Sequence, residues 1–422
     1  MTDQPRDGTP CAIQWIGTMP SHWSCRRLKH VASVALSSVD KKSHQQEEAV
    51  RLCNYVDVYH NERITSELDF MQATATLDEV RRFTLRSGDV LITKDSEAWD
   101  DIAVPAHVPA DLEGVLCGYH LAQVRPHNGL IDGAFLSWSF AARGINDQFR
   151  IEAAGITRYG LSKHSIDNAL FLVPPLDEQR AIARFLDRET ARIDALIEKK
   201  RRQIELLHEK RAALISQAVT KGLDPNAPVK DSGIEWLGEI PAHWDVLGLK
   251  RICRLVYGDA LASDGRVDGD VPVYGSNGPV GTHIHSNTVA PCIVVGRKGS
   301  FGKVQYSEAP VFAIDTTYYV DERFSKAALR WLYYALIWVR LDDVSKDSAV
   351  PGLDREDAYA RRLPTPPLDE QRAIAAFLDR ETARIDALVE KVNLSIDRLR
   401  EYRTALISAA VTGKIDVRKE VA

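Results

Sequence analysis

The chain contains few cysteines, and none of them lies in a paired motif. Its six cysteines are scattered through 422 residues, without a C-x-x-C pair. Disulfide frameworks and structural zinc sites depend on closely spaced cysteines, so both are excluded and a reducing compartment is indicated. No apolar run approaches the roughly 20 residues that a membrane helix requires. The first residues, MTDQPRDGTP, have no apolar core and are not typical of a signal peptide, so we expect a cytoplasmic protein without membrane contact.

The chain also lacks an excess of positive charge and a catalytic motif. Its formal net charge is −5. An isolated DNA-binding domain is usually basic, because neutralising phosphates supplies most of its non-specific affinity, so any nucleic-acid binding must be local or shared with partner subunits. The sequence has no G-x-G-x-x-G after a strand for a methyl donor, no Asn/Asp-Pro-Pro-aromatic methylation motif, no Walker sequence and no G-x-S-x-G. We therefore predict no catalytic residue, no metal site and no cofactor.

One long segment occurs twice. PPLDEQRAIARFLDRETARIDALIEK at residues 174–199 returns as PPLDEQRAIAAFLDRETARIDALVEK at residues 366–391, an offset of 192. The copies differ at two positions, one of which has Arg184 in the first copy and Ala376 in the second. The unit is far longer than the about 20–50 residues of a solenoid repeat, so the chain is a tandem duplication with two lobes.

Each copy predicts a long helix. Pro175 ends the preceding segment, Asp177 is a candidate N-cap, and Gly222 is a candidate C-terminal stop. These limits enclose about 42 residues, or roughly 60 Å of helix. The second helix is predicted from Asp369 to about Val411, just before a glycine.

Apolar residues recur at intervals of seven along both helices, as in a coiled coil. The first row consists of Leu186, Ile193, Leu207 and Leu214 in one copy and Leu378, Ile385, Val392, Leu399 and Leu406 in the other. The intervening row is predicted to contain Leu196, Ile204, Leu388, Ile396 and Tyr402. We expect the two helices to pair as an antiparallel coiled coil. A generic spacer or dimerisation stalk stays open, because it needs only this pattern.

The residues that such helices expose are repeated as well, which a stalk does not require. The first turns carry Glu178, Gln179 and Arg180 in one copy and Glu370, Gln371 and Arg372 in the other. Two near-identical outer faces favour two identical partners, one docked on each copy, with helix capping as the alternative role of these residues. Recent duplication would also explain the identity of the two faces.

The regions before the two helices differ in length but share an order of parts. Each opens with W-x-G-x-x-P-x-H-W and has an apolar strand that ends at a cation, at residues 90–94 and 292–298. A tyrosine-bearing strand, an aromatic helix and a Gly-Leu turn follow in both. We predict an α+β chain in which two globular mixed α/β domains are separated by the paired helices, with a pseudo-two-fold internal repeat. The predicted boundaries are 1–173, 174–223, 224–365 and 366–422.

With these features the chain resembles the specificity (S) subunits of type I restriction–modification systems over essentially its whole length. The resemblance rests on the duplicated PPLDEQ helix, the tryptophan motif that opens each lobe, and AAGITRYGLS at residues 153–162. It implies two target-recognition domains, each reading one half of a split sequence in double-stranded DNA. It also implies that the helices set the spacing and dock two methyltransferase subunits, and that endonuclease/translocase subunits complete the complex.

The candidate DNA-binding residues lie in loops of both lobes. Glycines and three cations at residues 296–303 suit contacts with phosphates or a guanine edge, and the glycine spacing excludes a P-loop. Solvated turns would explain such segments without DNA. The predicted residues are Lys94, Ser96, Thr157, Arg158 and Tyr159 in the first lobe, and Ser276, Asn277, Arg297, Lys298 and Lys303 in the second. Residues 347–353 replace 155–161 in the second lobe, so the roles of Thr157 and Arg158 are not carried over to Ala349 and Val350.

Two other functional classes stay open. A coiled-coil adaptor would bind proteins through its lobes and would not bind DNA. A nuclease would need more acidic residues than Asp95 and Glu97 at a suitable spacing, and the sequence does not supply them. His22 and His243, which precede tryptophans in the repeated motif, are interpreted as packing or capping residues.

Overall fold

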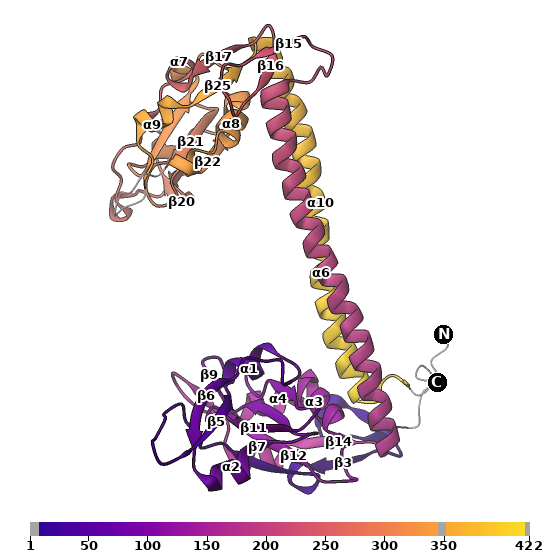
Figure 1. Ribbon diagram of the computed structural model, residues 1–422. Coiled ribbons are helices and arrows are strands. Elements are labelled where there is room, and N and C mark those ends of the chain that lie inside the picture. The colour runs from indigo at the N-terminus through magenta and orange to yellow at the C-terminus, as the bar shows by residue number, and fades with distance from the viewer. Residues whose placement is uncertain (1–7, 345–351, 418–422) are drawn as a thin grey trace. The chain divides into compact units, whose positions relative to one another are not determined.

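The computed structural model describes residues 8–344 and 352–417 of the chain (Figure 1). The chain forms two compact units, Met1–Lys199 with Leu394–Ala422, and Lys200–Asn393. Each unit contains one lobe, the first part of the long helix that follows this lobe, and the last part of the other long helix. The compact units therefore divide both helices, whereas the predicted boundaries follow the ends of the helices. Ala349 and Val350 lie outside the described residues.

Two four-stranded sheets form the first lobe. The first has the order β10-β8-β12-β4 (Pro105–His107, Val90–Thr93, Leu121–Pro126, Ala32–Leu36) and is antiparallel throughout. The second has the order β6-β5-β11-β7 (Met71–Ala75, Glu48–Cys53, Leu112–Cys117, Thr84–Leu85). Strand β8 is buried along its length, as its uninterrupted apolar sequence predicts. The predicted aromatic helix is α3 (Gly133–Ala141).

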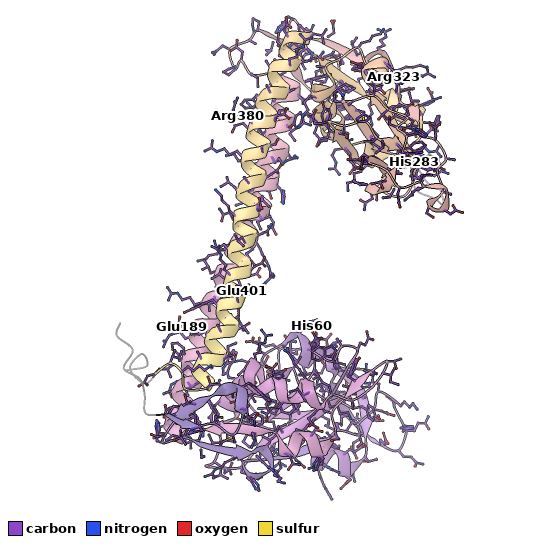
Figure 2. The ribbon with its side chains drawn as sticks, turned by 180° about the vertical axis from the view of Figure 1, so that it is seen from behind. His60, Glu189, His283, Arg323, Arg380 and Glu401 are labelled. Atoms are coloured by element: carbon purple, nitrogen blue, oxygen red, sulfur yellow. The ribbon has the colours of Figure 1, made fainter. Side chains whose placement is uncertain are left out.

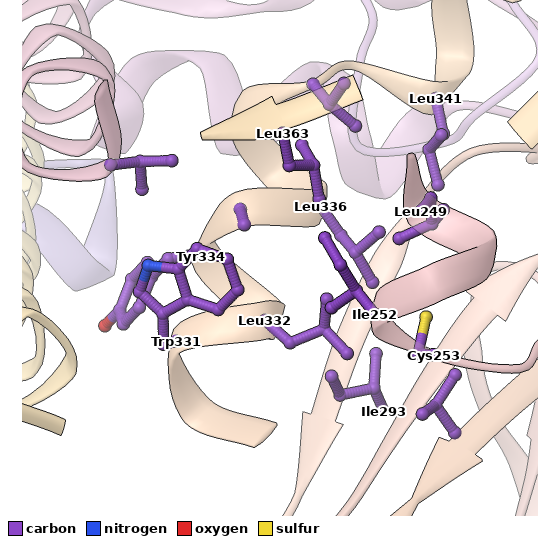
Figure 3. Packing of buried hydrophobic residues seen from close by; sticks show 14 of the residues in the cluster. Leu249, Ile252, Cys253, Ile293, Trp331, Leu332, Tyr334, Leu336, Leu341 and Leu363 are labelled. Atoms are coloured by element: carbon purple, nitrogen blue, oxygen red, sulfur yellow. The ribbon is translucent and has the colours of Figure 1, made fainter. Parts of the chain in front are cut away.

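The second lobe repeats the first of these sheets. Strands β18-β24-β21-β22 (Val256–Tyr257, Thr317–Asp321, Cys292–Gly296, Val304–Ser307) have the same antiparallel arrangement. The second lobe also contains a three-stranded sheet, β20-β19-β23 (Gly278–His283, Val271–Gly275, Phe312–Ala313), whose strands come between those of the first sheet along the chain. Helix α8 (Leu329–Trp338) packs Trp331, Leu332 and Leu336 into the core with Ile293 of β21 (Figure 3).

Shorter elements complete both lobes. Strand pairs are β1·β2 (Gly8–Pro10, Thr18–Pro20), β3·β14 (Ser24–Arg27, Leu170–Val173), β9·β13 (Asp95–Ser96, Tyr159–Gly160), β15·β16 (Val229–Asp231, Glu239–Pro241) and β17·β25 (Asp245–Gly248, Arg362–Thr365). Short helices are α1 (Tyr55–His60), α2 (Leu77–Phe83), α4 (Arg143–Glu152), α5 (Lys163–Asn168), α7 (Leu249–Ile252) and α9 (Arg355–Ala360). Strands β3 and β17 follow the two tryptophan motifs, and each pairs with the strand that leads into a long helix.

The two long helices are α6 (Leu176–Lys221) and α10 (Leu368–Val411). Gly222 and Gly413 follow them with φ of 73° and 72°, the left-handed conformation in which glycine ends a helix. The predicted cap at Asp177 is wrong, because this residue lies in the first turn with a 99% exposed side chain. The carbonyl oxygen of Pro175 instead accepts the first helical N–H groups, and the Asp177 carboxylate still faces the positive end of the helix dipole.

The first heptad row is buried or half-buried as predicted, and so are Ile204 and Ile396 of the second row, but its other three predicted positions lie one residue too early. Leu196, Leu388 and Tyr402 are exposed. A residue three or four positions after a first-row residue lies on the same side of a helix. The prediction chose the position three residues on because it is apolar in these cases, whereas the buried position is four residues on. The second row consists of Thr190, Ile197, Ile204, Arg211 and Ala218 in α6 and of Thr382, Val389, Ile396, Arg403 and Ala410 in α10.

Two ion pairs confirm that the helices run antiparallel. In the first unit Nε of Arg403 lies 3.1 Å from Oδ1 of Asp194, and in the second unit Nε of Arg211 lies 3.2 Å from Oδ1 of Asp386. Both pairs fit one register: Arg211 lies 17 residues after Asp194 in α6, and Asp386 lies 17 residues before Arg403 in α10. The repeat offset of 192 converts one pair into the other, which confirms the pseudo-two-fold repeat. Polar residues in a coiled-coil core fix orientation and register.

The C-terminal end of each long helix packs on the tryptophan motif of the lobe in its own unit. A Cβ on Gly413 would lie 2.6 Å from Cδ of Pro20 and 3.1 Å from the Trp23 ring. A Cβ on Gly222 would lie 3.0 Å from the Trp244 ring. Both glycines are therefore required by close packing as well as by their backbone conformation, and the end of α10 is part of the first lobe's surroundings.

The lowered pKa of Asp321 in the second lobe predicts that this lobe loses stability in acid. Burial raises its pKa, but hydrogen bonds from Arg323 and from the N–H groups of Val289 and Arg323 outweigh burial and hold the pKa below its ordinary value of 3.8. A lowered carboxylate pKa contributes stability above the unfolded-state pKa and loses it as the pH falls through the folded-state pKa. We expect the urea midpoint of the second unit to fall below about pH 4, less so in Asp321→Asn. The exposed Asp264→Asn control should behave as wild type; equal pH profiles for all three proteins would contradict this assignment.

Candidate nucleic-acid interface

Lys94 follows the buried strand β8 and is held by the surrounding chain. Its ammonium lies 4.4 Å from the centre of the Tyr119 ring and donates to the carbonyl oxygen of Ser37 at 3.3 Å. Burial lowers the pKa of Lys94, and Asp95 opposes this effect. Tyr119, which was predicted in a strand, lies in the turn before β12 and is 51% exposed. The lysine and the tyrosine thus form a supported cation–aromatic pair near the end of β8.

Arg158 is the more accessible of the two cations predicted to bind DNA in the first lobe. Its side chain is 53% exposed, and the guanidinium forms an ion pair with Oδ1 of Asp95 at 3.0 Å. The other carboxylate oxygen of Asp95 lies 2.9 Å from Nδ1 of His120. Thr157 is exposed, and Tyr159 pairs with Ser96 through β13 and β9. The structure therefore brings the five predicted residues of the first lobe into one region.

Ser96 is part of the support of this region and not of its surface. The residue is 5% exposed, and its hydroxyl oxygen accepts the Ala98 N–H at 3.3 Å. Its hydroxyl also interacts with the Tyr55 phenol. We therefore remove Ser96 from the residues proposed to contact DNA.

In the second lobe Arg297 follows the buried strand β21. Its guanidinium lies 5.1 Å from the centre of the Tyr257 ring, and that of Arg355 lies 4.9 Å from the same ring. The Nε of Arg297 is buried and has no hydrogen-bond partner in the part of the chain that the structure describes. Two guanidinium groups on one aromatic ring make a positively charged surface at the end of the sheet.

The other predicted residues of the second lobe gather beside Arg297. Lys303 donates to both the carbonyl oxygen and the side-chain oxygen of Asn277, each at 2.9 Å. A Cβ on Gly296 would lie 2.1 Å from the carbonyl oxygen of Ser300 and 3.0 Å from that of Ser276. Glycine at residue 296 thus permits the two loops, 274–278 and 296–303, to approach closely. Lys298 and Asn277 are exposed on this surface.

The same backbone contact supports the cation in both lobes. The Leu161 N–H donates to the carbonyl oxygen of Lys94, and the Leu353 N–H donates to that of Arg297, each at 2.8 Å. Leu161 and Leu353 are related by the repeat offset of 192. Lys94 and Arg297 are therefore equivalent positions, and the loops around them differ. A common framework with different loops suits recognition of two different ligands.

Sequence reasoning missed three residues beside these cations, the aromatic Tyr119 and Tyr257 and the basic Arg355. Tyr257 and Arg355 were not predicted, because nothing in the sequence shows that Arg297 and the distant Arg355 both lie on the ring of Tyr257. Tyr119 stood in a segment noted for its tyrosine, but its exposure was not foreseen. The three residues supply flat surfaces and a further donor, which are features used for contacts with bases and sugars.

The first turns of the long helices hold the lobes. The Gln179 side chain is fully buried, accepts the Asp132 N–H at 2.7 Å, and donates to the carbonyl oxygens of Pro174 at 2.8 Å and Leu130 at 3.1 Å. Gln371 accepts the Ala328 N–H and donates to the carbonyl oxygen of Pro366, each at 2.8 Å. These side chains are not available to another protein, so the docking hypothesis does not extend to Gln179 and Gln371.

The neighbouring glutamates bind the repeated histidines. An oxygen of Glu178 lies 2.8 Å from Nε2 of His22, and an oxygen of Glu370 lies 2.5 Å from Nε2 of His243. The other oxygen of Glu370 accepts the Trp244 indole N–H at 2.9 Å. These contacts support the interpretation of both histidines as structural residues.

Arg180 and Arg372 lie on the outer face of the helices. Their side chains are 51% and 68% exposed. Further along, Arg188 and Arg380 form equivalent contacts with the adjacent Glu189 and Glu381, at 2.9 Å and 3.1 Å. Figure 2 shows Arg380 projecting outward from α10. The exposed charges of the two copies are thus nearly the same.

In residues 8–344 and 352–417 no group of three or more His, Cys, Asp or Glu side chains is arranged to hold a metal ion. Within the same ranges, none of the helices combines the length and the apolar character needed to cross a membrane.

Comparison with known proteins identifies the family. Residues 20–206 and 241–398 match the type I restriction modification DNA specificity domain. The chain is 22% identical over 426 residues to a Methanocaldococcus jannaschii protein assigned as the specificity subunit of the type I restriction enzyme MjaX, with 96% of each chain covered.

Solved structures confirm the two-domain architecture with long helices. One similar chain comes from a structure that describes complex assembly and conformational transition of the type I R-M system. It has a TM-score of 0.74 at 16% identity, with 94% of this chain and 99% of that chain covered. The HsdS subunit from Thermoanaerobacter tengcongensis has a TM-score of 0.57 at 17% identity, with 94% and 98% covered. The chain therefore belongs to the type I restriction–modification DNA specificity family, and within it is a non-catalytic DNA-recognition subunit.

Proposed function

We propose that this chain reads a bipartite target in double-stranded DNA, one half with each lobe, and docks two methyltransferase subunits on its long helices. Endonuclease/translocase subunits join this complex, and the assembly works in the cytoplasm. The observation that carries the proposal is the equivalence of Lys94 and Arg297 on a repeated framework with dissimilar loops. Equivalent frameworks provide two similar docking geometries for DNA, and different loops provide two different sequences.

Each lobe supplies groups of the kind that contact DNA. In the first lobe Arg158 offers an exposed side chain and Thr157 an exposed hydroxyl, and Tyr159 and Lys94 are half-buried beside them in the same region. Arginine suits the major-groove edge of guanine, and hydroxyl groups suit bases or phosphates. The second lobe offers its cations together with the side chains of a turn, namely Arg297, Lys298, Lys303, Ser276 and Asn277.

The partners complete what this chain lacks. A net charge of −5 opposes tight binding of DNA by the chain alone, so methyltransferase subunits are expected to share the contacts with phosphates. Their docking surfaces are the two outer faces that carry Arg180 and Arg372. The faces differ at one exposed position: Arg184 lines a cavity of about 1080 Å³ in the first unit, and the second copy has Ala376.

A gel shift separates this function from that of an adaptor that does not bind DNA. The chain is mixed with random-sequence duplex DNA in the presence and absence of its methyltransferase subunit. We expect a shift that strengthens with the methyltransferase and weakens with salt. A stable protein complex that never shifts DNA would favour the adaptor.

Substitution of the second-lobe cations tests the interface directly. Lys298→Ala should weaken binding uniformly across sequences and reduce the salt slope by about 1, as expected for one lost phosphate contact. Arg297→Ala should cost about 1–3 kcal/mol on the cognate site only, as expected for a contact with a base. Fluorescence anisotropy with the assembled complex measures both effects. Lys326→Ala, an exposed cation beyond the other end of β24, is the control, and binding unchanged at low salt for the first two variants would remove this loop from the interface.

A further inference from the structure

We propose that Ile156 of the first lobe is an apolar wedge that inserts between adjacent base pairs of the DNA half-site. The inference rests on the proposed function, because it assigns a role within the surface that carries Arg158 and Thr157. It adds a residue that no charge or hydrogen-bond pattern in the sequence suggests.

Ile156 lies at the tip of a tight hairpin. Ala154 and Gly160 exchange two backbone hydrogen bonds, of 3.2 Å and 2.9 Å, and close the loop between them. Gly155 has φ of 155°, and a Cβ at this residue would lie 1.9 Å from the carbonyl oxygen of Arg158. Any other residue would open the loop. The tip is thus formed before DNA arrives, so little conformational freedom is lost on binding.

The hairpin is fixed to the cations of the first lobe. Tyr159 pairs with Ser96 of β9, and the Arg158 guanidinium is held by Asp95 at 3.0 Å. The Leu161 N–H donates to the carbonyl oxygen of Lys94 at 2.8 Å. When Arg158 contacts a phosphate or a base edge, the position of the tip relative to the DNA is therefore set.

The side chain at this tip is apolar and almost fully exposed. Ile156 is 94% exposed, more than any other large hydrophobic residue in the described part of the chain. A single exposed apolar residue is ordinary on a protein surface. Here it stands on a braced loop, directly beside two residues proposed to contact DNA. Apolar side chains such as isoleucine are those that proteins insert between base steps to unstack them.

The wedge predicts a distortion in only one half-site. The repeat offset of 192 places Ser348 at the corresponding sequence position of the second lobe, and this residue lies outside the described residues. A serine cannot unstack bases as an apolar side chain does. Pyrimidine–purine steps are the easiest to open, so the first half-site is expected to favour such a step beside the tip.

The experiment uses the complex assembled with its methyltransferase and a duplex that carries the target, which is defined by the adenines methylated in the host genome. Permanganate detects unstacked thymines, and diethyl pyrocarbonate detects unstacked purines. The variants are Ile156→Ser, which takes the second lobe's residue, and Ile156→Leu. The matched control is Ile151→Ser, because Ile151 is a 69% exposed isoleucine on α4, outside the hairpin.

The wild-type complex, Ile156→Leu and Ile151→Ser should all show a reactive step in one half-site, separate from any reactivity at the methylated adenines. Ile156→Ser should lose this step, and its affinity for the target should fall roughly tenfold. Its salt slope should stay unchanged, because no phosphate contact is lost.

A reactive step that persists in Ile156→Ser would overturn the wedge. So would a failure of Ile156→Ser to bind the methyltransferase before DNA is added, since Ile156 would then contact protein. If the wild-type complex does not distinguish the target from a scrambled duplex, the proposed function fails, and the wedge fails with it.

Discussion

Removal of one heptad from each long helix is expected to change the spacer of the DNA target and to leave both half-site sequences intact. Deleting Lys200–Leu206 from α6 and Lys391–Asp397 from α10 keeps both heptad rows continuous. The deletion retains the ion pairs of Arg403 with Asp194 and of Arg211 with Asp386, as well as all the contacts of Gln179 and Gln371. The lobes therefore remain folded and anchored, and only the length of the helical pair changes.

The size of the effect follows from helix geometry. Seven residues correspond to roughly 10 Å of helix, which is about three base pairs of DNA at 3.4 Å each. Half-sites read from one face of DNA lie roughly 10 bp apart from centre to centre, so a change of three base pairs abolishes recognition of the original target. Sequencing of methylated adenines in cells that express the deletion variant together with its methyltransferase reveals the new spacer.

A matched control separates length from sequence. In the control, the exposed residues of the same two heptads are replaced by alanine without any deletion, and we expect the original target to be methylated. Methylation of altered half-site sequences by the deletion variant would show that the helices do not act as a ruler. Methylation of the original target with its original spacer would show the same.

Loss of either buried glutamine is expected to destabilise the unit whose lobe it anchors. Gln179→Ala leaves the Asp132 N–H and the carbonyl oxygens of Leu130 and Pro174 without a partner. At about 1 kcal/mol or more for each buried group, the free energy of unfolding of the first unit should fall by about 2–4 kcal/mol. Gln371→Ala breaks two such bonds in the second unit and should cost about 1–3 kcal/mol there.

Urea unfolding followed by tryptophan fluorescence measures both effects, because each unit contains buried tryptophans. Each variant should move the transition of its own unit only, provided that the units unfold separately. Gln179→Glu should be at least as unstable as Gln179→Ala, since a carboxylate would face two carbonyl oxygens. Arg180→Ala and Arg372→Ala are controls on the exposed face and should stay within about 0.5 kcal/mol of wild type. If Gln179→Ala matched these controls, its three hydrogen bonds would not form in solution.

The helices and the duplication could be predicted from the sequence because both depend on regular spacing. Periodicity located both long helices, and glycines located their ends. Part of the second heptad row was placed one residue early, since Leu388 and Tyr402 are apolar but exposed, and the row contains Arg403 in place of Tyr402. A sequence pattern cannot show that an arginine occupies a coiled-coil position because an aspartate on the other helix pairs with it.

The candidate interface was predictable only where the two lobes share an order of parts. The sequence predicted in each lobe an apolar strand that ends at a cation, at residues 90–94 and 292–298, and the structure adds that Lys94 and Arg297 are the equivalent positions, since both accept the same backbone hydrogen bond. Tyr257 and Arg355 were missed, because their position against Arg297 depends on how distant segments fold together. Gln179 was assigned to the wrong surface for the same reason, since a polar residue in a first helical turn is usually exposed.

The packing of Gly413 against Pro20 and Trp23 has a consequence for biosynthesis. The second unit is one continuous stretch, Lys200–Asn393, whereas the first unit needs residues from both ends of the polypeptide. During synthesis the first lobe therefore cannot form its contacts with α10 until the last turns of this helix have been translated. A premature stop codon near the end of the gene would therefore damage the amino-terminal reading domain and spare the one encoded later.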